Sequence, residues 1–355
     1  MLAAPGVDLL DWLERFIFAE ERRYRSESHA EQAASVFIDR LISHGTTTAA
    51  VYSSSHKVAA QALFAEAERR RFGLIAGKTM MDRNAPTDVL DDAASGAADS
   101  AELINTWHRR GRLRYAITLR FAVTSTEEKL SATGELCKQF PDCLLQTHLS
   151  ESASEIEFVR KQFPAAKDYT DVYDHFGLLG PRSLFGHGIH LSERELNRLH
   201  ESDSTIVHCP TSNNFLGSGL FDIGHARNRS QPVGVAIATD VGGGTSYSML
   251  QTLGEAYKVA MLKGGKLDAL NGFYLATLGN AKRLHLDTEI GNLEPGKWAD
   301  IVVLNPSATA VLAARQQLST TVEESLFALM ILGDDRAVQA IYAAGQRFES
   351  RENIQ

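Results

Sequence analysis

Short apolar segments of the chain alternate with longer segments of helical periodicity, and this alternation restricts the fold more than any other feature. Seven of the apolar segments have the length and composition of strands: Thr47–Tyr52, Gly73–Gly77, Leu113–Thr118, Leu144–His148, Ser183–His187, Thr205–His208 and Val233–Thr239. Helical intervals such as Lys57–Arg71 and Ala101–Arg110 separate them. Repeated strand–helix units predict an α/β fold built around a parallel sheet.

The number of strands is unusual for such a fold. A closed barrel of parallel strands takes eight, and an unclosed parallel sheet leaves two edges without hydrogen-bonding partners. The chain also opens with a helical segment, Leu9–Glu21, where a barrel would open with a strand. We therefore expect a TIM-like (β/α)8 barrel whose first strand is missing from this chain.

The texture of the sequence changes after residue 286. Two helical segments, Ser246–Lys263 and Leu267–Leu284, follow the last predicted barrel strand, and strand-like pieces flanked by turns occur at Gly291–Pro306 and Val338–Gly345. We predict a barrel over residues 1–285 and a smaller β domain with a terminal helix over residues 286–355.

Within the barrel, Ser125 with Glu128 and Ser192 with Glu195 have the spacing of capping boxes, which mark helix starts.

The composition narrows the class of function. The formal net charge is −8 and the pI about 5.9, whereas nucleic-acid binders concentrate Lys and Arg. The three cysteines lack disulfide or metal-finger spacing, the first residues have no basic segment leading into an apolar run as a signal peptide would, and no window is apolar enough to span a membrane. We expect a cytoplasmic protein that acts on a small molecule.

Polar and aromatic side chains gather where the predicted strands end. They are Arg120, Phe121, His148, Glu151, His187, His208 and Asp240. The carboxyl ends of barrel strands meet at one rim, where the chemistry of such folds takes place. Neutral imidazole and carboxylate are the usual non-sulfur ligands of zinc, so the combination predicts a metal site. A lone histidine at a strand end is more often structural, and we interpret His208, which Cys209 and Pro210 follow, in that way.

Several of these segments resemble the amidohydrolase superfamily. They are Thr147–Glu151 (THLSE), Phe185–His187 (FGH), Ala238–Gly242 (ATDVG) and Gly291–Asp300 (GNLEPGKWAD). Longer segments are similar to its guanine deaminase branch in particular: Leu10–Tyr24, Gly77–Pro86, Thr118–Thr124, His208–Leu220, Ser248–Val259 and Gly333–Arg336. The resemblance covers nearly the whole chain.

The resemblance implies a (β/α)8 barrel with a small β-sandwich and the hydrolysis of guanine to xanthine and ammonia. It implies one divalent ion, zinc or iron, held by a His-x-His pair on the first strand, by His148 and by Asp240. Glu151 would be the proton shuttle and His187 would hold the attacking hydroxide. Arg120 and Phe121 would contact the purine, together with His148 and Glu151. We expect a homodimer.

One motif of the family is absent. None of the 12 histidines has another histidine two positions away, and His187 and His190, three apart, lie on opposite faces of a strand. We therefore expect a chain shortened upstream of residue 7, with weak metal binding, impaired activity and self-associating sheet edges. Two alternatives stay open: a deaminase of another purine, a pterin or a triazine, and a non-catalytic remnant that serves as an interaction module.

Overall fold

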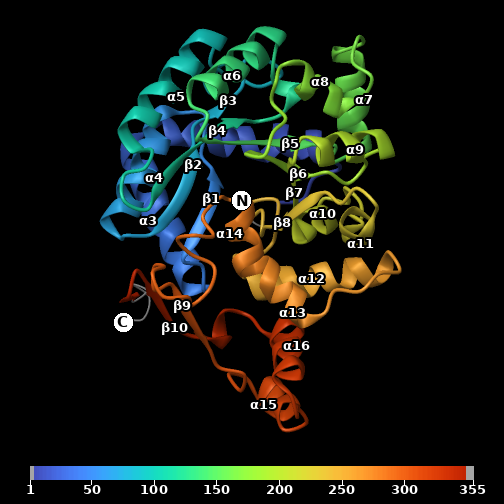
Figure 1. Ribbon diagram of the computed structural model, residues 1–355. Helices are drawn as coiled ribbons and strands as arrows, with labels where there is room; N and C mark the ends of the chain where they lie inside the picture. The colour runs from blue at the N-terminus through green and yellow to red at the C-terminus, as the bar shows by residue number, and fades with distance from the viewer. Residues whose placement is uncertain (1–3, 349–355) are drawn as a thin grey trace.

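The computed structural model describes residues 4–348 of the 355-residue chain and has a curved parallel sheet at its centre (Figure 1). Its seven principal strands are β1 (Thr48–Tyr52), β2 (Gly73–Gly77), β4 (Leu113–Leu119), β5 (Leu144–Leu149), β6 (Ser183–His187), β7 (Thr205–His208) and β8 (Gly234–Ile237). Each pairs in parallel with the next, and a two-residue strand, β3 (Thr79–Met80), pairs with β4. The seven predicted strands are confirmed: three have the predicted ends, and the ends of the other four differ by at most two residues.

Helices surround this sheet and precede its first strand (Figure 1). They are α1 (Leu9–Trp12), α2 (Phe18–Glu21), α3 (Glu27–Ser43), α4 (Lys57–Arg69), α5 (Ala93–Trp107), α6 (Glu127–Gln139), α7 (Ala153–Gln162), α8 (Tyr169–His175), α9 (Glu193–Glu201), α10 (Pro210–Phe215), α11 (Ile223–Asn228), α12 (Met249–Leu262), α13 (Ala269–Tyr274) and α14 (Asn280–Arg283). Two π-helical segments, η1 (Leu13–Ile17) and η5 (Leu275–Gly279), join α1 to α2 and α13 to α14. Four 3-10 turns complete this part of the chain and its tail: η2 (Arg22–Arg25), η3 (Thr87–Val89), η4 (Ala122–Thr124) and η6 (Asp335–Ala337).

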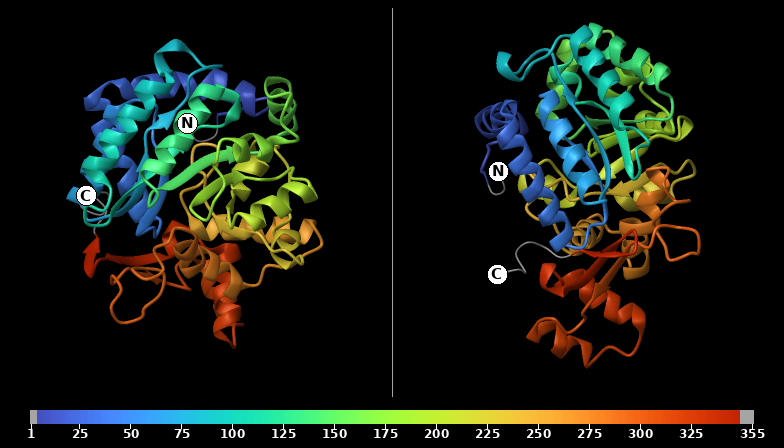
Figure 2. Two further views of the ribbon diagram at one scale, coloured as in Figure 1. Left: turned by 45° about the horizontal axis from the view of Figure 1, so that its top comes forward. Right: turned by 90° about the vertical axis from the view of Figure 1, so that its left-hand side faces the viewer.

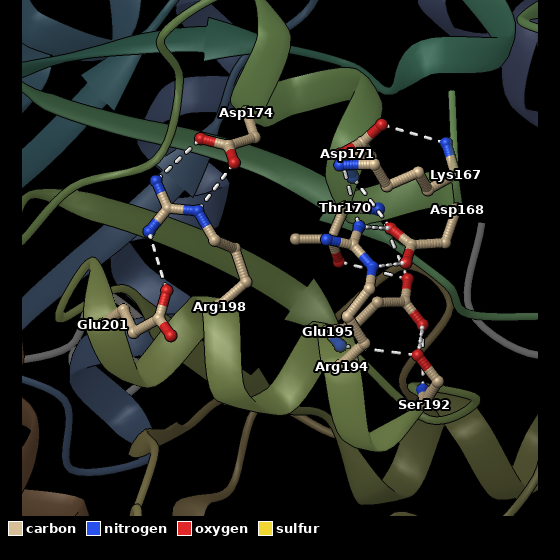
Figure 3. Close-up of polar contacts among 10 residues, drawn as sticks. All are labelled: Lys167, Asp168, Thr170, Asp171, Asp174, Ser192, Arg194, Glu195, Arg198 and Glu201. Atoms are coloured by element: carbon tan, nitrogen blue, oxygen red, sulfur yellow. Dashed lines mark hydrogen bonds and ion pairs between the residues drawn. The ribbon is translucent and has the colours of Figure 1, made fainter. Parts of the chain in front are cut away.

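One of the two predicted capping boxes forms. Ser192 Oγ accepts a hydrogen bond from the amide of Glu195 at 3.4 Å, and Glu195 Oε2 accepts one from the amide of Ser192 at 2.8 Å, at the start of α9 (Figure 3). The box predicted at Ser125 is wrong, because Thr126 is the residue that caps α6. Ser125 is buried in the preceding loop and donates its hydroxyl to the carbonyl of Phe121 at 2.9 Å.

The sheet forms an incomplete barrel. Strands β1 and β8 lie at its two ends, and no strand pairing joins them within residues 4–348. The free edge of β8 is covered, because the Asn280 side chain accepts a hydrogen bond from the amide of Ile237 at 3.0 Å and donates one to its carbonyl at 2.9 Å. The edge of β1 is open, with Ala50 and Tyr52 exposed. The expectation of two uncovered edges therefore holds for β1 and is wrong for β8.

A small antiparallel sheet lies beside the barrel in both views of Figure 2. Its strands are β9 (Ile301–Leu304), β10 (Val338–Ala343) and β11 (Gln346–Phe348), and the helices α15 (Ala310–Gln316) and α16 (Val322–Leu332) lie between β9 and β10. The strands predicted at 291–306 and 338–345 are confirmed. A terminal helix after β11 would lie outside the described residues, and the boundary at residue 286 stays a prediction.

Buried contacts attach the small sheet to the barrel. Arg112, just before β4, forms an ion pair with Asp300, and both side chains are 7% exposed. The Arg112 guanidinium also lies 5.6 Å from the centre of the Trp298 ring. The main hydrophobic core lies between the barrel strands and their helices and includes Phe64 and Tyr115, both fully buried. None of the helices within residues 4–348 is both long and apolar enough to cross a bilayer.

Candidate active site

A cavity of about 650 Å³ lies at the carboxyl ends of the barrel strands. All six residues predicted for the site line it: Arg120, Phe121, His148, Glu151, His187 and Asp240. They come from β4, β5, β6 and β8 or from the loops that follow these strands. The fold therefore brings together side chains that are up to 120 positions apart in the sequence, from Arg120 to Asp240.

His148, near the end of β5, is held as a neutral imidazole. Its Nδ1 lies 2.6 Å from the carbonyl oxygen of Arg120, which can only accept, so Nδ1 carries the proton and Nε2 keeps a lone pair. The ring lies 4.7 Å from that of Tyr52 and 5.5 Å from that of His187, between centroids. Burial, followed by the nearby charge of His187, lowers the pKa of His148 to about 3. This tautomer leaves Nε2 available to a metal ion.

Glu151 and His187 form a buried pair. His187 Nε2 lies 3.2 Å from Glu151 Oε2, and the two side chains are 2% and 3% exposed. The Oδ1 atom of Asn213 lies 2.8 Å from His187 Nδ1, and the Ser218 hydroxyl donates to Glu151 Oε1 at 3.1 Å. Burial raises the pKa of Glu151 to about 7, although His187 opposes the shift. Burial alone would lower the pKa of His187, but the charges of Glu151 and Asp240 outweigh it and raise the pKa.

These opposing effects leave the carboxyl group of Glu151 able to gain or lose a proton near neutral pH. A carboxyl group that exchanges its proton near neutral pH can serve as a general acid and base in the same cycle. The arrangement in the cavity therefore suits proton transfer to and from a bound molecule.

Asp240 follows β8 and is partly accessible to solvent. Its side chain is 33% exposed, and its Oδ2 lies 4.0 Å from His187 Nε2. The glycines after it make a tight turn, in which the amide of Gly244 donates to the carbonyl of Asp240 at 2.5 Å. A side chain at Gly244 would collide with the carbonyl oxygen of Thr239, so the turn requires glycine. This turn holds the carboxylate at the cavity wall.

Three non-glycine residues of this region have left-handed backbone conformations. Their φ angles are +49° at Ser150, +71° at His187 and +47° at Asp240. Such conformations cost on the order of 1–3 kcal/mol each and persist where the surrounding structure enforces them. Ser150 directly follows β5, His187 ends β6, and Asp240 lies three residues after β8. Strain at these positions is typical of sites where a side chain must point in one direction.

Arg120 and Phe121 form the wall on the β4 side. Arg120 is ion-paired with Glu21 of α2, and its guanidinium lies 5.4 Å from the centre of the Phe18 ring. The Phe121 side chain is buried, and its ring centre lies 6.3 Å from that of His148 in an edge-on arrangement. A fixed set of N–H donors beside an aromatic face can bind a flat heterocycle.

Sequence reasoning did not single out several residues that complete the site. They are Glu21, Tyr52, Asn213 and Ser218, which contact Arg120, His148, His187 and Glu151 respectively. Glu21, Asn213 and Ser218 lie in segments that carry the family resemblance, Leu10–Tyr24 and His208–Leu220, but nothing in their local pattern separates them from ordinary loop or helix residues. Only the packing of distant segments reveals their contacts.

Cys209 and His208 lie beside the site without the properties of ligands. One potential ligand atom each of His187, Cys209 and Asp240 lies within 4.8 Å of the others. Burial raises the pKa of the Cys209 thiol well above its usual range, which favours the protonated sulfur over the thiolate that binds metal. His208 is fully buried against the Phe221 ring, 5.1 Å away, and does not line the cavity. This placement agrees with a structural His208.

A second group of potential ligands, His108, Asp142 and Cys143, lies at the opposite end of the strands. Both nitrogens of His108 are already engaged, since the amide of Tyr115 donates to Nδ1 at 3.0 Å and Nε2 lies 3.2 Å from Asp142. We therefore assign this group a structural role.

The side chains in the cavity suit a divalent ion of the zinc type. His148 offers an unprotonated Nε2, and Asp240 offers a carboxylate. These are the atom types that zinc and iron prefer among non-sulfur ligands. The bond from His148 Nδ1 to the Arg120 carbonyl is the kind of second contact that fixes a ligating histidine.

Comparison with known proteins places this architecture in a family. A model of the amidohydrolase family matches residues 1–347. The guanine deaminase of Escherichia coli K12 is 46% identical over 346 residues, which are 98% of this chain and 78% of that protein. The solved structure of E. coli guanine deaminase matches with a TM-score of 0.96 and covers 99% of this chain and 81% of the other. A guanine deaminase structure from C. acetobutylicum, with guanine bound in the active site, matches with 28% identity and a TM-score of 0.88, covering 98% and 83%.

The fold, the rim of histidine and carboxylate and these matches define the class, and the chain belongs to the amidohydrolase family. Within that family its sequence and structure are similar to those of guanine deaminases. The predicted family and the predicted barrel type are both confirmed.

Proposed function

We propose that this chain removes the amino group of guanine by hydrolysis, converting guanine and water to xanthine and ammonia. The relatives support a hydrolytic deaminase that acts on a C–N bond. The observation that carries the proposal is the meeting of the six predicted residues around one cavity. One wall offers an arginine and an aromatic ring to a flat base, and the other offers a carboxyl group poised for proton transfer.

The roles of the side chains follow from their positions. Arg120 donates hydrogen bonds to an acceptor atom of the purine, and Phe121 packs against the ring. Glu151 gives its proton to the ring nitrogen beside the carbon that is attacked, regains one from the oxygen that came from water, and passes it to the departing amine. The second proton of that oxygen, taken up by Asp240, restores Glu151. A carboxyl group with a pKa of about 7 can do both near neutral pH. His187, whose Nε2 lies 3.2 Å from Glu151 Oε2 and 4.0 Å from Asp240 Oδ2, orients the attacking water.

The family implies a divalent metal, for which we propose zinc, and iron shares the same ligands. Of the residues in the cavity, His148 and Asp240 would hold it. When bound, such an ion lowers the pKa of water to about 7 and so supplies a nucleophile at neutral pH. Asp240 can accept the proton that this water loses.

A panel of substrates tests the proposal. We expect ammonia release from guanine in Zn²⁺-supplemented buffer, and a fall on the order of 100-fold or more for Glu151→Gln, because the variant cannot exchange a proton. Adenine, a pterin and a triazine serve as competing substrates, and His225→Gln, an exposed histidine paired with Glu193, is the matched control. Faster release from any competitor would replace guanine. No release from any of them would favour an interaction module.

We also expect this chain to retain metal weakly. Catalytic zinc sites have three protein ligands, and among the 12 histidines none forms a His-x-His pair that would complete the set with His148 and Asp240. Elemental analysis after dialysis should find well under one zinc ion per chain, and still less in the His148→Ala variant. One tightly bound ion per chain in the unaltered protein would contradict this expectation.

A further inference from the structure

Glu21 and Arg120 are 99 positions apart in the sequence, yet they meet at the wall of the cavity. Glu21 ends α2, and Arg120 follows β4. Glu21 Oε1 accepts a hydrogen bond from Arg120 Nη1, and the two side chains are only 15% and 12% exposed. Ion pairs on protein surfaces usually contribute little to stability, but an ion pair that is this buried restricts the position of both side chains.

The rest of Arg120 is also held in place. Its amide donates to the carbonyl of Met80 at 3.1 Å, and its own carbonyl accepts from His148 Nδ1 at 2.6 Å. Below the guanidinium lies the ring of Phe18, from the same short helix as Glu21. The backbone is therefore fixed by the barrel, and the direction of the guanidinium is fixed by α2.

Glu21 has few other partners. Its Oε2 is buried and has no hydrogen-bond partner among the described residues. The carboxylate is therefore committed to Arg120, since a buried charge needs an opposite charge nearby. The pair presents no net charge to the cavity, which suits a neutral base.

We propose that Glu21 is a positioning residue for substrate recognition: it aims the Arg120 guanidinium at the exocyclic oxygen of the purine. This inference rests on the proposed function. With one edge of the fork engaged by Glu21, the remaining N–H groups of Arg120 point in a fixed direction and donate to a carbonyl oxygen. The pair then selects purines that carry this oxygen over purines that lack it, because without the oxygen a buried donor stays unpaired.

Two ligands separate positioning from general damage. Guanine carries the exocyclic oxygen, and 2-aminopurine is the same base without it. Binding of 2-aminopurine is followed by its own fluorescence, and binding of guanine by competition, in Zn²⁺-supplemented buffer. Loss of the contact that orients the Arg120 guanidinium should weaken guanine binding and leave 2-aminopurine binding nearly unchanged.

The variants are Glu21→Gln and Arg120→Gln, with Asp88→Asn as the matched control. Asp88 forms an exposed ion pair with Arg22, one position after Glu21, at 3.0 Å, so its loss disturbs the same segment without touching Arg120. We expect Glu21→Gln to weaken guanine binding by about 10- to 100-fold, the loss typical of a hydrogen bond to a charged group. Asp88→Asn should bind both bases as the unaltered protein does.

The outcomes distinguish the inference from the function on which it rests. Unchanged guanine binding by Glu21→Gln, or an equal loss for both bases, overturns the positioning role while guanine binding by the unaltered protein stands. If the unaltered protein does not bind guanine, the proposed function fails, and the inference fails with it. A selective loss shared by Glu21→Gln and Arg120→Gln supports both.

Discussion

Burying Glu151 and His187 in the active site has an electrostatic cost to the stability of the folded protein. Both side chains are almost completely buried, and the pKa of Glu151 is raised from its usual 4.5 to about 7. A carboxyl group whose pKa rises on folding destabilises the native state when it ionises. The protein therefore gives up stability above pH 4.5 in order to keep an acid that works near neutrality.

Replacing Glu151 with glutamine should remove this cost. The unaltered protein should lose stability relative to Glu151→Gln as the pH rises from about 4.5 to about 7, and the difference should then stay constant. A shift of this size corresponds to about 3 kcal/mol at most. Urea unfolding at pH 5 and pH 8, in chelator, measures the difference, with the exposed Glu135→Gln as the matched control. A difference between the two proteins that is the same at both pH values would refute the burial argument.

Among the individual residues of the site, those that end strands were the easiest to predict from the sequence. His148, His187 and Asp240 could be placed at one rim because parallel strands share a direction, and the structure brings their side chains to one cavity. Glu21 and Asn213 could not be found in this way. Their partners are reached through the packing of α2 and α10 on the barrel, which no local pattern encodes.

Among the elements, α8 and α9 show how the outer helices of the barrel are joined (Figure 3). Glu195 is buried and divides its carboxylate between two helices. Its Oε2 accepts from the amide of Ser192 at 2.8 Å at the start of α9, and its Oε1 accepts from the Thr170 hydroxyl at 3.1 Å in α8. The other links are exposed or half-exposed ion pairs, such as Arg198 with Asp174 at 2.6 Å.

The two kinds of link should differ in their contribution to stability. We expect Glu195→Ala to lower the free energy of unfolding by about 2–4 kcal/mol, because it leaves the buried donors of Thr170 without a partner and removes the capping box of α9. Asp174→Ala, which removes only a half-exposed ion pair, should cost less than about 1 kcal/mol. Urea unfolding at neutral pH compares them. Equal losses would mean that the buried carboxylate contributes no more than the surface pair.

The Asp174 pair should respond to acid in a defined direction. The hydrogen bond from Arg198 lowers the pKa of Asp174. The stability that this ion pair contributes is therefore present above the usual pKa range of an aspartate and is lost as the pH falls through the lowered pKa.

The capping box at Ser192 was predictable, because its four residues are contiguous. The bond from Thr170 to Glu195 was not, because it depends on how two helices pack.

For the whole molecule, the open edge of the sheet is the decisive feature. The sequence predicted seven strands and therefore an unclosed barrel, and the structure confirms both. The sequence could not predict that the edge of β8 is covered. The side-chain amide group of Asn280 reaches the backbone of Ile237 only after the helices that follow β8 fold back. Within residues 4–348, the outer edge of β1 has no strand partner.

We expect the chain to self-associate through β1, because an uncovered strand presents unpaired N–H and C=O groups to its surroundings. The backbone groups of alternate residues in β1 face β2: the carbonyl of Thr47 accepts from the amide of Gly73, and the amide of Ser53 donates to the carbonyl of Gly77. Ala50 lies at an even-numbered position between these two residues, so its amide points to the open side. Ala50→Pro removes that donor and blocks strand pairing at the edge. In sedimentation velocity over a range of concentrations, the unaltered protein and Ala50→Ser should associate, and Ala50→Pro should remain monomeric. A monomeric unaltered protein at high concentration would show that the β1 edge is not a contact surface.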